Sequence, residues 1–544
     1  MTRPIESIAD DFGLRADEID PWGPGVAKVR ASTAFLEEPL RARLVLVSSI
    51  SPTAAGNGKT TVTIGLTQAA RRLGARAVCA LRQPSLGPVF GAKGGGTGGG
   101  RAELIPPSRI NLHFTGDLHA ITSANNLLAA LVDNEVYFGG STRIDSRQIV
   151  LRRALDMNDR FLRKTIIGLG GKAMGTPRED GFDITAASEV MAIVCLSRDY
   201  ADLKERLGRM IVGYASDGTP VRAVDLRANG AMAALLRDAL LPNLVATTEG
   251  APALVHGGPF GNIAHGCNSI VATRLAMRRA DVVFTEAGFG FDLGAEKFLD
   301  IKCRTAGIWP HAVVLVATLR ALKLHGGAAP NEVAKPDHGA LLQGLANLDR
   351  HLESVRAFGL TPTVALNVWN GDTREEIELV LAALRERGVN AGSVDVYGRG
   401  GEGALEVTDG LLQRLRTTET TPAYLYPLDI PPTAKILKIA QTIYGARNVN
   451  YTPLALDQLD RAVRLGYDRL PVCMAKTHLS VSDNAKLIGR PRDFDITIRE
   501  IRISAGAGFL VALAGEILTM PGLPRAPHSI DIDLSPDGTI TGIT

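Results

Sequence analysis

Cysteine is scarce in this chain, with five residues scattered through 544. No two of them form a CxxC pair and their number is odd: Cys79, Cys195, Cys267, Cys303 and Cys473. Neither a disulfide framework nor a zinc-ligand pattern has this arrangement. We therefore expect a protein of a reducing compartment.

Long apolar runs are also missing. No stretch approaches the roughly 18 consecutive apolar residues of a membrane span, and residues 1–6 carry charge where a signal peptide would be apolar. The 60 Lys and Arg residues exceed the 57 Asp and Glu residues by only three. So small a net charge attracts neither nucleic acid nor an anionic membrane. We expect a cytoplasmic protein that binds neither, and whose anion sites are local.

Length and composition indicate a globular protein of several units. A chain of 544 residues exceeds one hydrophobic core and predicts roughly three to four units. Hydrophobic residues make up 45% and charged residues 22%, which is typical of globular proteins.

A parallel α/β unit is predicted soon after residue 40. An apolar run at 44–47 predicts a buried strand, and an amphipathic stretch at 60–73 predicts a helix after a Gly- and Thr-rich turn. The run at 77–81 predicts the next strand. Residues 1–40 are polar and mixed, and we expect helical turns there.

Later segments continue the α/β pattern after an interruption. Residues 150–245 alternate helices with few signals of buried strands, which predicts an insertion. The βαβ rhythm then resumes with apolar runs at 281–284, 312–317 and 362–366. Near the end, β-rich stretches lie at 495–498 and 501–503.

The strongest local motif is SPTAAGNGKTT at 51–61, between a predicted strand and helix. Small residues let backbone amides surround phosphate oxygens, and a helix N-terminus adds roughly half a positive charge. Lys59 can reach the β- and γ-phosphates, and the Thr60 hydroxyl can bind Mg²⁺. A strict phosphate loop has Gly at position 53, so an ordinary Gly-rich turn is the alternative. The predicted nucleotide-binding residues are Thr53, Gly56, Gly58, Lys59, Thr60 and Thr61.

Two charged residues are expected at the carboxyl ends of other predicted strands. Glu286, in TEAGFG, follows the run at 281–284 and is expected near Mg²⁺, with a helix N-cap as the alternative. Arg82, in LRQPSLGP, directly follows the run at 77–81. Its guanidinium can hold a carboxylate or an acyl phosphate with two parallel hydrogen bonds, and a surface ion pair is the alternative.

Two further segments contain candidate residues. The run GAKGGGTGGG at 91–100 is too rich in Gly for regular structure and contains Lys93, so it predicts a mobile loop that closes over phosphates. A flexible surface linker is the alternative. His113 and His119 are six residues apart, which fits neither one helix face nor a hairpin, so structural or substrate-orienting roles are favoured over metal binding.

Many ordered segments together make the chain similar to the formate–tetrahydrofolate ligase family, also called formyltetrahydrofolate synthetases. They include GNGKTT, LRQPSLGPVFGAKGG, INLHFTGDLHAI, LDMNDR, IIGLGGKAMGTPREDGFDIT, GPFGNIAHGCNS, TEAGFGFDLGAEKF, DIKCR, GRGGEGA, PVCMAKTHLSVSD and IRISAGAGFLVALAGEILTMPGLP. The resemblance implies an α/β fold with a parallel-sheet P-loop nucleotidase core and two smaller α+β domains. We expect the first part of the nucleotide-binding domain at 1–150, an inserted domain at 151–245, the rest of the core with folate-side elements at 246–420, and a C-terminal domain at 421–544.

The resemblance also implies the reaction. Formate would be activated by ATP with Mg²⁺ as formyl phosphate and passed to tetrahydrofolate, free or polyglutamylated, in a homotetramer activated by K⁺ or NH₄⁺. Lys59 and Thr60 would hold the nucleotide and Mg²⁺, with Glu286 as a second metal-side residue. Arg82 and Lys93 would hold the acyl phosphate, so Lys59, Arg82 and the adjacent Gln83 form the expected catalytic group.

Several positions depart from the family pattern. Gln83 replaces a usual Glu and cannot accept a proton, and Trp369 and Tyr397 stand where the family has Phe and Trp around the pterin. Val368 replaces a usual Lys and Arg101 a usual Tyr. The formate–tetrahydrofolate ligase is the favoured hypothesis. The alternatives are an acyl-phosphate ligase with another acid or acceptor and a weakly active nucleotide-binding paralogue.

Overall fold

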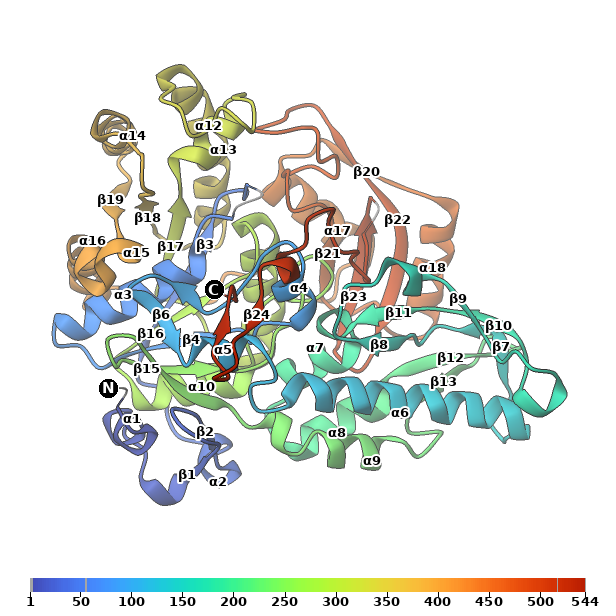
Figure 1. Ribbon diagram of the computed structural model, residues 1–544. Helices are drawn as coiled ribbons and strands as arrows, with labels where there is room; N and C mark the ends of the chain where they lie inside the picture. Colours follow the sequence, from blue (N-terminus) through green and yellow to red (C-terminus); the bar gives the residue numbers. More distant parts are fainter. Residues whose placement is uncertain (1–2, 54–55, 516, 544) are drawn as a thin grey trace.

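A twelve-stranded sheet runs through the centre of the computed structural model, which describes residues 3–53, 56–515 and 517–543 (Figure 1). Seven neighbouring strands form its parallel part, in the order β15 (Pro252–Val255), β4 (Ala77–Leu81), β16 (Val282–Glu286), β3 (Arg43–Ser49), β17 (Ala312–Ala317), β18 (Pro362–Asn367) and β19 (Asn390–Val394). The fold is therefore α/β with a large, mainly parallel sheet. The predicted strands at 44–47, 77–81, 281–284, 312–317 and 362–366 are confirmed as β3, β4, β16, β17 and β18.

Helices cover both faces of this sheet, which explains why its strands are apolar on both sides. Leu44 and Leu46 of β3 pack into one hydrophobic cluster, and the alternating Val45 and Val47 pack into the other. Helix α3 (Lys59–Arg72) covers the second face. The first face is covered mainly by α10 (Ile270–Arg279), α12 (Leu319–His325) and α13 (His338–Ala357). Near the β18–β19 edge, α15 (Val396–Arg399) and α16 (Leu405–Leu415) pack on the same face as α3, and α14 (Arg374–Glu386) packs on the first face.

Antiparallel strands extend the other edge of the sheet. Strand β14 (Asn243–Thr247) pairs with β15, with β6 (Ala102–Ile105) and with β2 (Ala27–Val29), and β2 pairs with β1 (Ile19–Pro21). The expectation of only helical turns before residue 40 is therefore wrong, although α1 (Ile5–Asp11) and α2 (Ala31–Ala34) are present. The hairpin is stabilised by β14, more than 200 residues away in sequence, which no local pattern reveals.

The segment after the long helix α6 (Asp117–Phe138) contains more strands than predicted. A three-stranded sheet comprises β7 (Ile144–Ile149), β12 (Ile211–Ala215) and β13 (Pro220–Arg222), and β8 (Arg153–Leu155) pairs with β11 (Phe182–Ile184). A hairpin joins β9 (Thr165–Ile167) to β10 (Arg178–Asp180). Most of these strands are only three residues long and half-buried, so no apolar run marks them. The helices of this segment are α7 (Glu189–Leu196), α8 (Tyr200–Arg209) and α9 (Asn229–Leu235).

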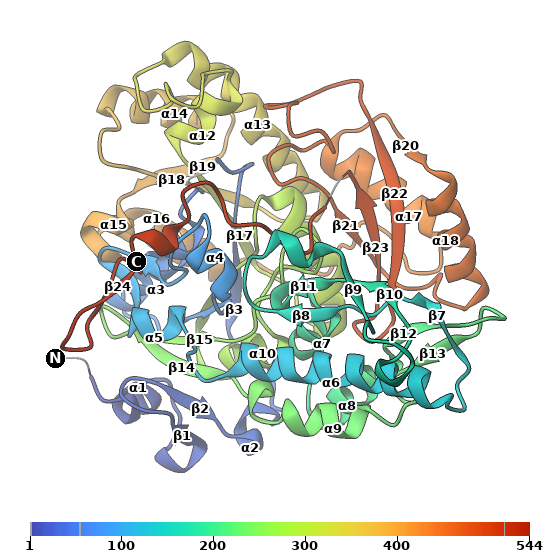
Figure 2. The ribbon, with the colours of Figure 1, turned by 45° about the vertical axis from the view of Figure 1, so that its right-hand side comes forward.

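The C-terminal part forms a separate four-stranded sheet. Its order is β20 (Asn448–Tyr451), β22 (Asp495–Ser504), β23 (Phe509–Ala514) and β21 (Val472–Ala475), with α17 (Pro432–Ile439) and α18 (Pro453–Arg464) beside it (Figure 2). The two β-rich stretches predicted near the end are one strand, β22. The chain then returns to α4 (Leu86–Phe90), where the His528 N–H donates to the Gly91 carbonyl oxygen at 2.7 Å.

The cysteines and the helices bear on two sequence-based expectations, the absence of disulfides and the absence of a membrane span. All five cysteines are free and buried, as the absence of a disulfide pattern predicts. Across the described ranges, the helices are too short or too polar to cross a bilayer.

A buried ion pair connects the N-terminal hairpin to the rest of the fold. Lys28 Nζ lies 2.8 Å from Asp117 Oδ1, and the side chains are only 1% and 3% exposed. Lys28 also donates to Asn243 Oδ1 at 2.9 Å, while Asn243 Nδ2 donates to Asp117 Oδ2 at 2.8 Å. These contacts join β2, the start of α6 and β14.

We predict that Lys28→Met lowers the free energy of unfolding by about 3–5 kcal/mol, because Asp117 is left as a buried charge without its cation. Lys164 pairs with Glu179 in the β9–β10 hairpin, where the side chains are 77% and 68% exposed. Lys164→Met is the matched control and should change stability by less than about 1 kcal/mol. Urea unfolding of both variants measures the difference, and equal losses would contradict the assigned role of Lys28.

Candidate functional site

The predicted site residues meet at one edge of the sheet. Parallel strands present their carboxyl ends together, and ligands of open α/β sheets bind at that edge. The segments that follow β3, β4, β16, β18 and β19 contain, respectively, Lys59, Arg82, Phe289, Trp369 and Tyr397, while Glu286 is the last residue of β16. Strands β3 and β16 are neighbours, so the GNGKTT segment and the TEAGFG segment lie side by side.

The turn between β3 and α3 has a defined conformation. Gly58 precedes α3 with φ 73°, and a Cβ there would lie 2.5 Å from Asn367 Nδ2, so a side chain does not fit. Asn367, at the end of β18, donates to the Asn57 carbonyl oxygen at 3.2 Å. The Thr53 hydroxyl donates to the Gly56 carbonyl oxygen at 3.3 Å. Positions 54 and 55 of the motif lie outside the described residues.

A buried carboxylate joins three elements of the site. Glu286 Oε2 accepts a hydrogen bond from the Thr60 hydroxyl at 2.8 Å, and Arg82 Nε donates to Oε1 at 3.4 Å. These partners are side chains rather than helix N–H groups, so Glu286 does not act as the alternative N-cap. A Cβ on Gly288 would lie 2.8 Å from Arg82 Nη1, so the guanidinium lies directly against that backbone.

Thr60 and Glu286 together suit Mg²⁺. The ion prefers hard oxygen ligands and binds one or two protein oxygens, with phosphates and water completing its octahedron. The hydroxyl and carboxylate that now share a hydrogen bond are such a pair. No group of three or more His, Cys, Asp or Glu side chains able to hold a metal occurs in the described part of the chain.

Three positive charges surround this edge. Burial, opposed by the charge of Glu286 and assisted by the charges of Arg82 and Lys93, lowers the pKa of Lys59 to about 7. Lys59 Nζ has a hydrogen bond to Ser49 Oγ at 3.3 Å. The Lys93 side chain is exposed, but its ammonium lies 4.9 Å from the centre of the Phe289 ring. Loss of solvation there, followed by the charge of Arg82, lowers the Lys93 pKa to about 8. An anion bound here would relieve this repulsion.

His478 also lies at the site, although no sequence pattern selects it. Its ring stacks on Phe289, with the centroids 4.5 Å apart and the planes at 26°. It follows β21, in the C-terminal sheet, and lies some 190 residues from Phe289 in sequence. Phe289 itself has φ 58°, a left-handed backbone conformation that is rare for a bulky residue and typical of functional loops. This positive φ has no single-residue sequence signal, because the tertiary packing of the loop imposes it.

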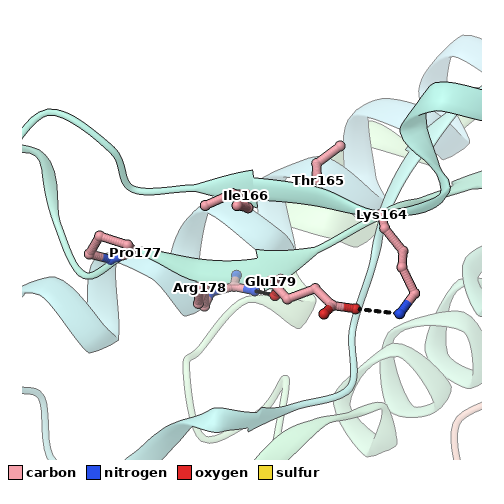
Figure 3. A pocket seen from close by; sticks show the side chains of 6 residues that line it. All are labelled: Lys164, Thr165, Ile166, Pro177, Arg178 and Glu179. Carbon is pink, nitrogen blue, oxygen red and sulfur yellow. Dashed lines mark hydrogen bonds and ion pairs between the residues drawn. The ribbon is translucent and has the colours of Figure 1, made fainter.

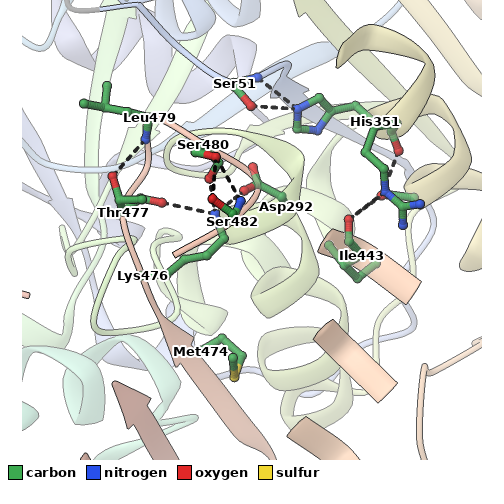
Figure 4. Close-up of polar contacts among 12 residues, drawn as sticks. Ser51, Asp292, His351, Ile443, Met474, Lys476, Thr477, Leu479, Ser480 and Ser482 are labelled. Atoms are coloured by element: carbon green, nitrogen blue, oxygen red, sulfur yellow. Dashed lines mark hydrogen bonds and ion pairs between the residues drawn. The ribbon is translucent and has the colours of Figure 1, made fainter. Parts of the chain in front are cut away.

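Three side chains clamp the start of the SPTAAGNGKTT motif, and Figure 4 shows one of them, His351, beside Ser51. His351 Nε2 accepts a hydrogen bond from the Ser51 N–H at 3.0 Å. His325 Nε2 donates to the Ser51 carbonyl oxygen at 2.9 Å, since its Nδ1 accepts from the Gly489 N–H at 3.1 Å. Asn347 Nδ2 donates to Ser51 Oγ at 3.2 Å. Both imidazoles are neutral in this arrangement, and α12 and α13 thereby position the loop.

A second buried pair lies next to this clamp. Lys476 Nζ is 2.7 Å from Asp292 Oδ2, and both side chains are almost completely buried. Lys476 also donates to the carbonyl oxygens of Thr477 and Ser480. Figure 4 shows Lys476, Asp292 and Ser480 close together below Ser51. The pair fixes the chain just before His478 against the helical segment after TEAGFG.

The two predicted aromatic residues follow adjacent strands. Val368, between β18 and Trp369, donates its N–H to the Val394 carbonyl oxygen at 2.9 Å, which holds the ends of β18 and β19 together. The Arg320 guanidinium lies 4.8 Å from the centre of the Trp369 ring. Tyr397 is exposed, and its carbonyl oxygen accepts from the Arg101 N–H at 2.9 Å.

Gln83 is buried beside Arg82, and the described residues offer its side-chain amide no hydrogen-bond partner. Its backbone N–H donates to the Gly257 carbonyl oxygen at 2.7 Å. Gln83 thus borders the site, with a polar group that protein atoms leave unsatisfied.

The Gly-rich segment is more ordered than the sequence predicts. It includes the short strand β5 (Gly98–Gly99), the Gly96 N–H donates to Asn111 Oδ1 at 2.7 Å, and the C-terminal tail packs on its start through His528. Closure over phosphates stays a prediction. His113 and His119 are both exposed, and neither is brought to the sheet edge by a contact in the structure.

A surface depression occurs elsewhere, in the β9–β10 hairpin (Figure 3). It is open and lined by Lys164, Thr165, Ile166, Pro177, Arg178 and Glu179. The exposed Lys164–Glu179 pair is its main polar feature. Its residues provide neither a nucleophile nor an anion-binding loop, so the sheet edge remains the candidate site.

Comparison with known proteins agrees with this geometry. A sequence model described as formate–tetrahydrofolate ligase matches residues 1–544. The chain belongs to the formate–tetrahydrofolate ligase family. A formate–tetrahydrofolate ligase of Myxococcus xanthus (strain DK1622) is 56% identical over 544 residues, covering 99% of both chains. One of Psychrobacter sp. (strain PRwf-1) is 53% identical over 554 aligned positions, covering 99% of this chain and 97% of the relative. The resemblance inferred from the sequence motifs is thus confirmed over the whole chain.

The histidine clamp of this family member should weaken in acid. Burial lowers the pKa of His351 to about 4, against an unfolded value of about 6.5. The neutral ring therefore stabilises the fold fully above about pH 6.5, and this contribution is lost as the pH falls towards about 4. In His351→Gln, the side-chain carbonyl can accept the hydrogen bond from Ser51 without titrating. We predict that the melting temperature of this variant falls less between pH 6.5 and pH 4 than that of the unmodified protein.

The exposed His338 at the start of α13 provides the control. His338→Gln should keep the acid dependence of the unmodified protein. A His351→Gln curve parallel to that of the unmodified protein would contradict the proposed coupling between His351 protonation and stability.

Proposed function

We propose that this chain ligates formate to tetrahydrofolate in an ATP-dependent reaction, giving 10-formyltetrahydrofolate, ADP and phosphate through formyl phosphate. The observation behind the proposal is that Lys59, Thr60, Arg82 and Glu286 meet at one sheet edge in a chain of the formate–tetrahydrofolate ligase family. Such an edge suits the binding of a nucleotide and a small acyl phosphate.

The turn between β3 and α3 is proposed as the P-loop. Its left-handed Gly56 and Gly58 and the N-terminus of α3 would surround the β- and γ-phosphates. Lys59 would bind the transferring phosphoryl group, and its present hydrogen bond to Ser49 is the contact that a phosphate oxygen would replace. Thr60 and Glu286 would hold Mg²⁺, which would neutralise charge on the phosphates. Thr53 and Thr61 would line the same turn.

The first step joins formate to the γ-phosphoryl group. A formate oxygen attacks the γ-phosphorus while the bond to the ADP oxygen breaks, so formyl phosphate and ADP form. Positioning and charge stabilisation dominate such transfers. Lys59 stabilises the transferring group, and Arg82 and Lys93 bind the acyl phosphate oxygens. In the second step the folate amine attacks the formyl carbon, the bond to phosphate breaks, and the amine loses a proton.

Trp369 and Tyr397 are proposed to hold the pterin. They follow the adjacent strands β18 and β19, which the Val368–Val394 hydrogen bond keeps together. The Arg320 guanidinium beside Trp369 would provide positive charge for the glutamate end of a folate, polyglutamylated or not.

The same proposal includes the organisation of the molecule. The family assignment also implies a homotetramer and activation by K⁺ or NH₄⁺. It implies domains at 1–150, 151–245, 246–420 and 421–544. Most strands of the main sheet come from the first and third of these ranges, while β14 crosses the boundary at 245. The four-stranded sheet comes entirely from the last range, which supports a separate C-terminal domain.

A second candidate keeps the acyl-phosphate chemistry but changes the acceptor. The buried and unpartnered Gln83 amide favours it, because a carboxylate able to take the amine proton is absent from that position.

The direct test measures ADP formation with ATP, Mg²⁺ and formate, with and without tetrahydrofolate. The product 10-formyltetrahydrofolate is detected by its acid conversion product. Formate-dependent turnover that requires tetrahydrofolate and yields this product supports the proposal. Formate-dependent turnover without the product would favour another acceptor, and no formate dependence would refute both candidates.

Lys59→Ala should lower ligase turnover by at least about 100-fold, because it removes the cation that stabilises the transferring phosphoryl group. Lys204, exposed on α8, is the matched control, and Lys204→Ala should keep full turnover. Steady-state rates at saturating substrates, with circular dichroism to verify folding, make the measurement. Near-normal turnover of folded Lys59→Ala would remove this residue from the mechanism.

Arg82→Lys keeps the charge but loses the planar guanidinium fork. The rate of the acyl-phosphate step should therefore fall by a larger factor than the affinity for ATP. The rate of this step is measured as formate-dependent oxygen-isotope scrambling between the bridging and non-bridging positions of the ATP β-phosphate. Arg76, at the amino end of β4 and paired with Asp281 in solvent, provides the control Arg76→Lys. Equal losses of scrambling and of ATP affinity in Arg82→Lys would make Arg82 a structural residue.

A further inference from the structure

The transfer step requires a group that takes the proton of the attacking amine. Gln83 cannot accept one. Glu286 already accepts from Thr60 and Arg82, and Asp292 is paired with Lys476. Lys59, Arg82 and Lys93 have to bind the anion. The base must therefore be another side chain at this edge with a free lone pair.

His478 has the required position. The buried Lys476, two residues earlier, binds Asp292 and two carbonyl oxygens of its own loop, and thereby fixes the course of the chain (Figure 4). The His478 ring then stacks on Phe289, the ring over which the Lys93 ammonium also lies. His478 and Lys93, the lysine proposed to bind the anion, thus contact the same side chain. That side chain, Phe289, is three residues after Glu286 in the sequence.

No described residue forms a hydrogen bond with the ring nitrogens of His478, and the ring is only partly buried. Burial lowers the pKa of His478 to about 4, with further lowering by Lys93, Lys476 and Lys59 and an opposing effect of Asp292. The imidazole is therefore neutral near pH 7. A bound acyl phosphate would offset the charges of Lys59 and Lys93 and so raise the basicity of His478 when the acceptor is in place.

We propose that His478 is the proton acceptor for the amine that attacks the acyl phosphate, an inference that rests on the proposed function. The amine nitrogen forms a bond to the formyl carbon, and the bond from that carbon to the phosphate oxygen breaks. Phosphate leaves with the electron pair of that bond. The amine proton passes to an imidazole nitrogen of His478, which later releases it to water. A base on the C-terminal segment thus replaces the carboxylate missing at Gln83.

Two variants separate proton transfer from packing. His478→Phe keeps an aromatic ring against Phe289, and His478→Gln keeps a polar side chain, but both lack a basic nitrogen. Formyl transfer to tetrahydrofolate should fall by about 10²- to 10⁴-fold in both variants. Formate-dependent isotope scrambling within ATP, which needs no acceptor amine, should stay within about twofold of the unmodified protein. The exposed His338→Gln should change neither rate.

Chemical rescue adds a readout that a structural role would not move. In His478→Ala, added imidazole should restore part of the formyl transfer without changing scrambling, because a free base can occupy the vacated space. Variants that keep the normal transfer rate, or that lose scrambling and transfer equally and without rescue, would overturn the inference. Absence of formate-dependent scrambling and product in the unmodified protein would instead overturn the proposed function on which it rests.

Discussion

The Glu286 carboxylate is the contact on which the site depends. It is buried at the end of β16 and accepts hydrogen bonds from Thr60 on α3 and from Arg82 after β4. A buried carboxylate is stable only with such partners, so these contacts fix the phosphate-loop helix and the guanidinium relative to each other. The parallel pairing of β4, β16 and β3 makes the arrangement geometrically available, because all three strands end at the same edge.

Positive charge at this edge exceeds what Glu286 can balance. Arg82 and Lys93 lie close enough to Lys59 to lower its pKa, and Arg82 also lowers the pKa of Lys93. The fold tolerates this repulsion because the surroundings are braced: α12 and α13 clamp Ser51, and the Lys476–Asp292 pair holds the adjacent segment. Such preorganised charge favours a phosphorylated ligand, which agrees with the family to which the chain belongs.

Distant parts of the chain complete the site. The C-terminal sheet contributes His478 through the segment after β21, and the tail beyond β23 returns to the Gly-rich segment through His528. The C-terminal residues therefore do more than form a separate sheet. They contact the edge at Phe289 and the Gly-rich segment at Gly91, and they bring the His478 imidazole to the site.

The sequence by itself determined the α/β class, the five parallel strands with long apolar runs, the Gly-rich turn between β3 and α3 and the family, because these depend on local patterns and contiguous motifs. It also selected Lys59, Thr60, Arg82 and Glu286, since residues after parallel strands must share an edge. Only the tertiary structure decided the N-terminal hairpin, the short strands after α6, the histidine clamp and the place of His478. Those features depend on contacts between residues far apart in the chain, and short, half-buried strands or single histidines have no periodicity that would reveal their partners.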